Sequence, residues 1–220
     1  IADLSTVSLS TLSTVTLVRG AGSARYGSGA LGGALILTTR TGGVGSAGRL
    51  AIGSEGRFDT QVSSGVEGRA GRLLLSAGRR YSRNDFAFRN RLMPGAPEER
   101  RRNADTETNS VALSASSGGA RATVRYDRLE RGVPGRMGTS LFDGDRWSED
   151  RWSASGAVAR PDATLSAGLR ELRLRFAPGT TAAGTGQRAF DARLGGETLI
   201  GGSTALAVRL SFERISPAAR

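Results

Sequence analysis

The chain of 220 residues contains no cysteine and no histidine. Without cysteine it can have neither a disulfide framework nor thiolate chemistry. Without histidine it lacks the commonest general base and the commonest metal ligand, so we do not expect an enzyme. Catalysis would depend on carboxylates such as those of Asp143, Asp145, Glu149 and Asp150, a run that is better interpreted as a polar loop. A Ca²⁺ site there is an alternative, but the spacing matches no defined calcium loop. We expect no cofactor.

Lysine and long apolar runs are also missing. All 31 basic residues are arginine, and the formal net charge is +11. One explanation for the excess of arginine is codon bias. The alternative is nucleic-acid binding, which would need the arginines to gather on one helix or face. Because the arginines recur along the whole chain, we do not expect a nucleic-acid partner. No segment approaches the roughly 20 apolar residues of a membrane-spanning helix.

Glycine is abundant, and many glycines lie between two short apolar runs, residues 15–18 and 34–39. Both runs favour strands. Between them, Gly27, Gly29 and Gly32 match the dinucleotide fingerprint G-x-G-x-x-G, which requires a helix after the glycines. A strand follows here instead, apart from a single helical turn expected at residues 23–26. The passage is therefore interpreted as a tight strand–turn–strand packing unit, with nucleotide binding as the less favoured alternative. Residues 41–47 resemble a linker in composition.

From residue 48 onward, polar and apolar residues alternate. This pattern predicts nine strands, at residues 49–55, 59–67, 72–82, 109–117, 120–130, 151–159, 163–176, 187–200 and 204–215. Short turns at residues 68–71, 118–119, 161–162 and 201–202 alternate with longer loops, including residues 83–108 and 131–150. In the seventh strand the apolar phase changes after Leu169, which predicts a β-bulge near Arg170 and Glu171.

Long alternating strands with short turns at one end and long loops at the other are typical of outer-membrane barrels. The aromatic residues are interpreted as interfacial girdles; they are Tyr81, Tyr126, Trp147, Trp152, Phe176, Phe190 and Phe212. The predicted fold is all-β: a partial transmembrane antiparallel β-barrel of about nine strands, not closed. A soluble β-sandwich is the less favoured alternative. Because lipid does not tolerate open sheet edges, we expect a fragment of a longer protein.

Residues 15–39 resemble the end of the plug domain of TonB-dependent outer-membrane receptors. The resemblance rests on Val18-Arg19-Gly20, Ser23, Tyr26-Gly27-Ser28-Gly29-Ala30, Gly32-Gly33 and the apolar strand that ends at Thr39. The family often has proline after Arg-Gly, where this chain has Ala21. The resemblance implies the C-terminal part of a plug domain with its linker at residues 1–47, and the N-terminal part of the barrel at residues 48–220.

The resemblance also implies a function: energised uptake of a scarce nutrient, such as a ferric siderophore or cobalamin. The residues of the plug motif would have a structural or gating role; they are Arg19, Gly20, Tyr26, Gly27, Gly29, Gly32 and Gly33. The family's pattern implies that Arg19 meets an acidic group of the barrel wall. The alternative is a solvated or local ion pair of little energetic value.

The arginines of the long loop are candidate ligand contacts, since guanidinium groups form bidentate bonds with carboxylate or phosphate. They are Arg89, Arg91, Arg100, Arg101 and Arg102, and a merely solvated loop is the alternative. The implied partners are outer-membrane lipid and lipopolysaccharide, TonB, whose contact segment we do not find in this chain, and a small-molecule ligand such as a metal chelate. The implied location is the cell outer membrane. A passive porin or structural barrel and a secreted β-rich adhesin remain alternatives.

Overall fold

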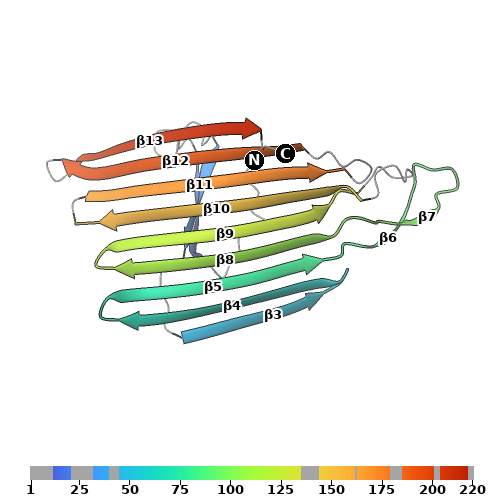
Figure 1. Cartoon of the computed structure of the whole chain (residues 1–220), viewed down its shortest axis with the longest axis horizontal. Helices are drawn as coiled ribbons and strands as arrows, with labels where there is room; N and C mark the ends of the chain where they lie inside the picture. Colours follow the sequence, from blue (N-terminus) through green and yellow to red (C-terminus); the bar gives the residue numbers. More distant parts are fainter. Residues whose placement is uncertain are drawn as a thin grey trace.

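The computed structural model of the chain describes residues 12–20, 32–39, 45–134, 144–161, 163–178, 185–200 and 204–217. All regular elements in these ranges are β-strands, arranged as one nine-stranded sheet and two hairpins (Figure 1). No helix with the length and apolarity to cross a membrane occurs in the described ranges.

The nine-stranded sheet is antiparallel throughout, and neighbours in the sheet follow one another along the chain. Its order is β13-β12-β11-β10-β9-β8-β5-β4-β3. The strands are β3 (Gly45–Gly53), β4 (Arg57–Gly68), β5 (Gly71–Ser82), β8 (Thr106–Ser117), β9 (Ala120–Gly132), β10 (Arg146–Ala159), β11 (Ala163–Ala177), β12 (Thr185–Ile200) and β13 (Thr204–Pro217). The described sheet is open, with β3 and β13 at its edges. The prediction of an all-β, unclosed sheet of about nine strands is therefore confirmed.

The strands are joined by short turns at one end of the sheet. Arg69 and Ala70 connect β4 to β5, and Gly118 and Gly119 connect β8 to β9, as predicted. Gly71 begins β5 with a φ of 127°, and a Cβ there would collide with the backbone oxygen of Ser116. Only glycine fits this position without a shift of the backbone. The predicted turns at residues 161–162 and 201–202 lie wholly or partly outside the described residues.

Longer connections lie at the other end of the sheet, which we call the loop end. The connection between β5 and β8 contains a small hairpin, β6 (Ala87–Arg89) and β7 (Glu98–Arg100), in a stretch predicted as irregular. By contrast, only residues 54–56 separate β3 from β4. Three strands begin at least three residues earlier than predicted: β3 at Gly45, inside the predicted linker, β8 at Thr106 and β10 at Arg146. At the starts of β8 and β10, charged residues that are common in loops hid the continued pairing, and at the start of β3 glycine and serine did so.

The two faces of the sheet differ in burial and in polarity. Successive side chains of a strand point to opposite faces, and all the most buried side chains of the nine strands lie on one of them, the inward face. Most are polar, and Leu74, Ala112 and Leu129 are the apolar exceptions; the buried polar ones are Asp59, Ser76, Thr108, Ser114, Asp127 and Glu149.

The opposite, outward face carries apolar side chains exposed to solvent. They include Val62, Val66, Leu73, Leu75, Val111, Leu113, Val124, Trp152, Val158, Leu165 and Leu169. A soluble sandwich buries its apolar face against a second sheet, whereas within the described residues no second layer covers this one. The arrangement is apolar outside and polar inside, as in a barrel wall in lipid.

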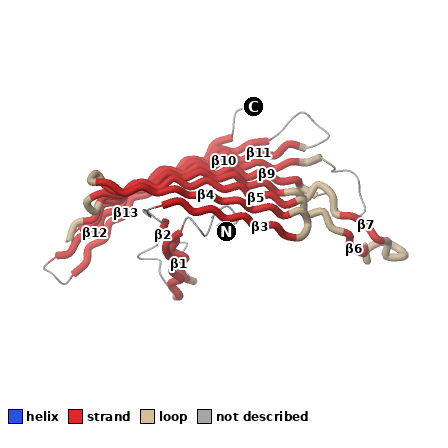
Figure 2. The backbone as a smooth tube through the Cα atoms, turned by 90° about the horizontal axis from the view of Figure 1, so that it is seen from below, coloured by secondary structure: helices blue, strands red, loops and turns tan. Residues whose placement is uncertain are grey.

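A separate hairpin pairs β1 (Leu12–Arg19) with β2 (Gly33–Thr39), from Arg19 opposite Gly33 to Leu12 opposite Thr39. The two strands predicted for this region are therefore confirmed. Figure 2 shows the hairpin beneath the arched sheet, on its concave side. Because side chains converge on a concave surface and become buried, the buried, polar face is the one turned toward the hairpin.

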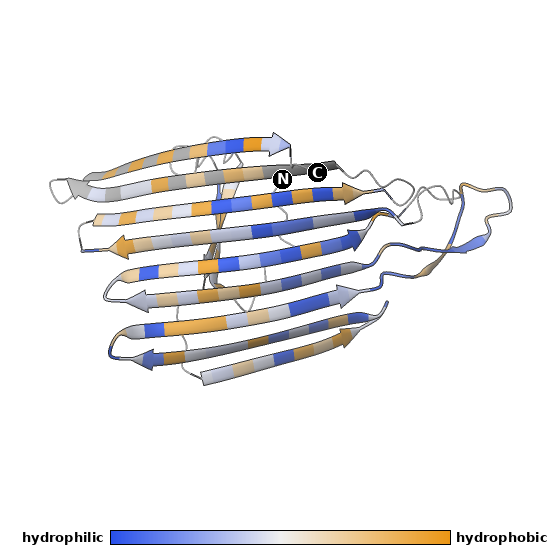
Figure 3. Cartoon of the chain, in the orientation of Figure 1, coloured by the Kyte–Doolittle hydropathy of each residue, from blue (hydrophilic) through white to orange (hydrophobic). Residues whose placement is uncertain are grey.

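The predicted bulge in the seventh strand is wrong. β11 pairs with β10 and with β12 in unbroken register through Arg170 and Glu171. The apolar phase changes because the environment of each face changes along the strand. Leu165 and Leu169 point outward near the short turns, whereas Leu172 and Leu174 point inward near the loop end. Figure 3 shows hydrophilic residues gathered toward the loop end of several strands.

Candidate functional site

The β1–β2 hairpin holds the described part of the glycine motif. Gly33 has a φ of 140°, and a Cβ there would collide with the backbone oxygen of Val18, so glycine is required where the strands meet. Gly20 has a φ of 95°, while Gly32 has open space around it and no such conformation. Arg19 ends β1 with an exposed side chain, and no ion pair joins it to a described residue of the sheet. Tyr26, Gly27 and Gly29 lie outside the described residues.

The arginines predicted to contact ligand gather on the β6–β7 hairpin, which we call the arm. Arg89 lies opposite Glu98, and Arg100 forms an ion pair with Asp85. The hydrogen bond to Asp85 raises the pKa of Arg100. The backbone N–H of Arg101 donates to the carbonyl of Phe86 at 2.8 Å. All five arginines are exposed or half-buried: Arg89, Arg91, Arg100, Arg101 and Arg102. The structure thus brings these predicted residues together, although acids neutralise part of their charge.

The tip of the arm is held in shape by Asn90, whose side chain is only 1% exposed. Its Oδ1 accepts from the N–H of Leu92 at 3.1 Å, and its Nδ2 donates to Glu99 at 3.1 Å. Its own N–H donates to the carbonyl of Pro97 at 2.8 Å. These bonds close the tip on itself and leave Leu92 82% exposed. The arm therefore projects from the loop end as an ordered element (Figure 1).

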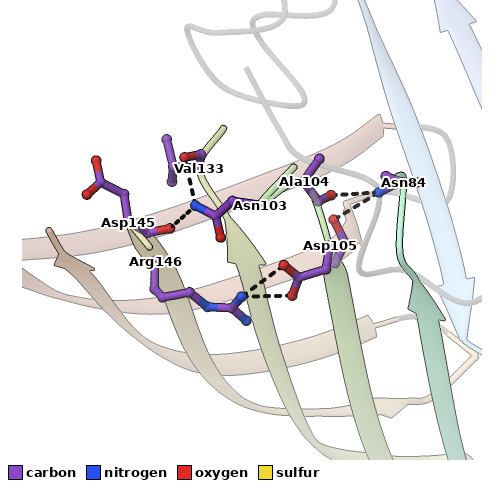
Figure 4. A network of polar contacts seen from close by, with 8 residues as sticks. Asn84, Asn103, Ala104, Asp105, Val133, Asp145 and Arg146 are labelled. Carbon is purple, nitrogen blue, oxygen red and sulfur yellow. Dashed lines mark hydrogen bonds and ion pairs between the residues drawn. The ribbon is translucent and has the colours of Figure 1, made fainter. Parts of the chain in front are cut away.

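Figure 4 shows how the roots of two long connections are joined. Asn103, on the connection between β5 and β8, donates from Nδ2 to the carbonyls of Val133 at 3.0 Å and Asp145 at 2.9 Å. Arg146 at the start of β10 donates from one guanidinium nitrogen to both carboxylate oxygens of Asp105, at 2.9 and 2.8 Å. The two connections are thus fixed to each other where they leave the sheet.

Ion pairs occupy the middle of the inward face. Arg80 contacts Asp59 at 3.2 Å, and Arg125 forms two bonds of 2.6 Å with Asp127. Arg151 is bonded to Glu149 in the same manner along β10. These carboxylates are nearly buried, so each needs its partner to offset the loss of hydration. This part of the wall is polar, but its charged side chains are largely paired with one another.

The outward face changes character along the strands. Tyr126 and Trp152 stack with ring centroids 4.5 Å apart at the border of the apolar region. Beyond them, toward the loop end, the outward side chains of β5, β8, β9 and β11 include the ion pairs Arg79–Glu107, Arg128–Glu130 and Arg173–Glu171. Nearer the short turns, small side chains of β8 to β11 leave an apolar groove of about 580 Å³, bordered by Leu73 and Leu194.

Trp147 and Phe176 do not belong to an outward aromatic girdle, and that part of the prediction is wrong. They lie opposite each other on β10 and β11, on the inward face at the loop end. Arg131 of β9 lies opposite Trp147, and its guanidinium carbon is 5.7 Å from the centre of a Trp147 ring. The sequence contains a signal for this: Trp147 and Trp152 are an odd number of residues apart, so on one unbroken strand they must point to opposite faces.

The acidic run considered for catalysis or calcium does not form one site. Glu149 points inward and Asp150 outward, where Asp150 accepts a bond of 2.7 Å from the Tyr126 hydroxyl. Asp145 lies at the loop root described above, and Asp143 is outside the described residues. In the ranges that the structure describes, no three acidic side chains gather so as to hold a metal ion.

No family model matches the sequence, and no curated protein matches it. Among solved structures, the siderophore receptor PiuA from Acinetobacter baumannii is similar, with a TM-score of 0.62 and 12% identity. The alignment covers 93% of this chain but only 35% of PiuA, so the chain spans about a third of that receptor. The copper transporter OprC aligns with a TM-score of 0.44 and 14% identity over 94% of this chain and 43% of its own, too weak a likeness to carry an argument. The chain therefore has a fold like part of this siderophore receptor.

Proposed function

We propose that the chain forms part of a TonB-dependent outer-membrane receptor, with residues 1–47 as the end of the plug and residues 48–220 as the first part of the barrel. In this proposal the complete receptor takes up a scarce nutrient, such as a ferric siderophore or cobalamin, and further strands complete the wall. It is a transporter and not an enzyme. Its partners are outer-membrane lipid and lipopolysaccharide, TonB and a small-molecule ligand.

The observation that carries the proposal is the inverted polarity of the sheet. Apolar side chains such as Leu113 and Val124 are exposed, while Asp59 and Asp127 are nearly buried. In water this arrangement costs hydrophobic free energy, whereas in a bilayer it places apolar surface against hydrocarbon and polar surface in the lumen.

The β1–β2 hairpin favours a receptor over a passive porin or a secreted adhesin. A glycine-rich hairpin on the concave side is the position expected for the end of a plug, and neither alternative requires such a module (Figure 2). The fold likeness to a siderophore receptor supports the same choice. In the proposed receptor, the residues of the plug motif serve the plug, and the five arginines of the arm contact the ligand; the motif is Arg19, Gly20, Tyr26, Gly27, Gly29, Gly32 and Gly33.

The two tryptophans provide the test, because Trp152 points outward and Trp147 inward. The full-length protein and its Trp147→Phe and Trp152→Phe variants would be reconstituted in phosphatidylcholine bilayers with brominated acyl chains. The difference between the parent protein and each variant gives the fluorescence of the tryptophan that was replaced. We expect bromine to quench the contribution of Trp152 and to leave that of Trp147 nearly unquenched. Aqueous iodide serves as the reciprocal probe. Equal quenching of both tryptophans by bromine would exclude the lipid-facing assignment.

A further inference from the structure

We propose that Arg131, Trp147 and Phe176 form a binding site for an aromatic anion, meaning a ligand with a planar ring and a carboxylate or similar anionic oxygen. That this ligand is the transported cargo rests on the proposed function. That it binds depends only on the three side chains. The site lies on the inward face, beside the roots of the long connections.

The three residues come from three neighbouring strands and lie in one cross-strand row. Arg131 is opposite Trp147, and Trp147 is opposite Phe176. Directly opposite side chains of an antiparallel pair are about 5 Å apart at Cβ, so this row is a continuous surface. Trp147 and Phe176 are half-buried and Arg131 is exposed. The surface therefore offers two rings and a cation that a ligand can reach from the lumen.

Apolar side chains support the row from the next inward position on the two flanking strands, β9 and β11. Leu129 of β9 is 4% exposed, and Leu174 of β11 is half-buried. Glu149, the β10 residue between them, is already bonded to Arg151. An apolar support on an otherwise polar wall is unusual for a lumen filled with water, and it lowers the cost of placing an aromatic ring there.

The charge of Arg131 sets the sign of the ligand. In the described part of the chain no carboxylate pairs with Arg131, whereas its neighbour Glu130 points outward and binds Arg128. Among the described residues the guanidinium faces the Trp147 ring and makes no side-chain hydrogen bond, which leaves its N–H donors available for bidentate bonding to an anion. A neutral aromatic molecule would forgo these bonds, and an aromatic cation would be repelled.

The backbone around the site is fixed before any ligand binds. The N–H of Gly132 donates to the carbonyl of Asp105, and that of Val133 donates to the carbonyl of Asp145, both at 2.9 Å. Arg146, next to Trp147, is held by Asp105. A site that is already ordered loses little conformational entropy on binding.

The test uses salicylate as the probe and the full-length protein in detergent micelles. Binding would be followed by the change in the intrinsic fluorescence of salicylate and checked by calorimetry. We expect saturable binding that falls by roughly tenfold or more in Arg131→Gln, since each tenfold loss corresponds to one lost charge-assisted contact. Trp147→Leu and Phe176→Leu should weaken binding measured by calorimetry to a similar or smaller extent.

Matched controls come from the same strands. Arg128→Gln on β9 and Trp152→Leu on β10 alter the same residue types on the outward face and should change the affinity less than twofold. Benzyl alcohol, a ring without charge, and inorganic phosphate, a charge without a ring, should bind at least tenfold more weakly than salicylate. Heat-modifiable migration in gels would confirm that each variant is folded.

Three results would overturn the proposal: no saturable salicylate binding to the folded protein, equal affinity in Arg131→Gln, or benzyl alcohol binding as tightly as salicylate. Each would mean that the cation and rings form only a structural contact. None of them bears on the bromolipid experiment, in which Trp152 reports the lipid-facing wall. Failure of this site and failure of the proposed receptor function are thus distinguishable.

Discussion

On the outward face, the short-turn half and the loop-end half of the same strands differ in polarity. Near the short turns, outward positions hold Leu73, Leu113 and Leu165, while inward positions hold mostly serine and arginine, with Leu74 as a buried exception. Near the loop end, outward positions hold ion pairs such as Arg79–Glu107, while inward positions combine Leu129 and Trp147 with the buried carboxylates described above. One unbroken pleat carries both patterns, so the inversion is encoded entirely in the choice of side chains.

This change in the polarity of the outward face indicates the environment of each half of the strands. Hydrocarbon makes an outward leucine favourable and an outward arginine costly, whereas water or lipid head groups favour the arginine. The stacked Tyr126–Trp152 pair lies at the border between the two patterns, where amphipathic rings are best placed. In the proposed receptor, the strands therefore continue beyond the hydrocarbon layer toward the loops.

The largest expected effect comes from putting charge into the short-turn half. Leu113→Arg on β8 places a guanidinium at an outward position that is 44% exposed within the apolar band. We expect a loss of about 2–4 kcal/mol in the free energy of unfolding from a bilayer, against about 0–1 kcal/mol near its surface. Urea titration of the full-length protein in lipid vesicles would measure it.

Asn109→Arg is the control, because Asn109 lies on the same strand and face but in the loop-end half. If both arginines destabilised the protein equally, the two halves would not differ in their surroundings.

An intermediate effect is expected where the loop roots meet. Asn103→Ala removes the donor that serves the carbonyls of Val133 and Asp145, and each lost bond is worth about 0.5–1.5 kcal/mol. We expect faster hydrogen exchange at the amides of Gly132 and Val133, with little change in the short-turn half. Exchange that accelerates throughout the sheet would show that the two halves unfold together, contrary to the expected difference between them.

The smallest effect belongs to the outward ion pairs of the loop-end half. Arg79→Ala breaks a contact of 3.1 Å with Glu107 between partly exposed side chains. We expect a loss of about 0.2–1 kcal/mol that shrinks as salt is added, as for other surface pairs. Unfolding titrations at low and high ionic strength would measure it. A loss that does not depend on salt would place this pair in a dry environment, contrary to its assignment.

The alternation of single residues made most of the sheet predictable. Strand number, antiparallel order and the turn at Gly118 and Gly119 all follow from a period of two and from turn chemistry. The same method failed at the polarity inversion. It treated the change from Leu169 to Leu172 as a slip of the backbone, because a periodic pattern cannot separate a bulge from a change of surroundings.

The candidate site was less predictable than the sheet. The arginines of the arm are adjacent in sequence, but their ordering depends on Asn90, a single polar residue whose bonds span the arm. Arg131, Trp147 and Phe176 come from three strands and meet only through register. Register depends on the lengths of the connections, which composition does not specify.

Gly71 limits how this wall can change over evolutionary time. Any side chain at this position would collide with the carbonyl of Ser116, so the β4–β5 hairpin and the neighbouring strand β8 cannot diverge independently. Relatives of this chain should keep glycine there even when most other positions have drifted, which makes Gly71 a fixed landmark for aligning distant sequences.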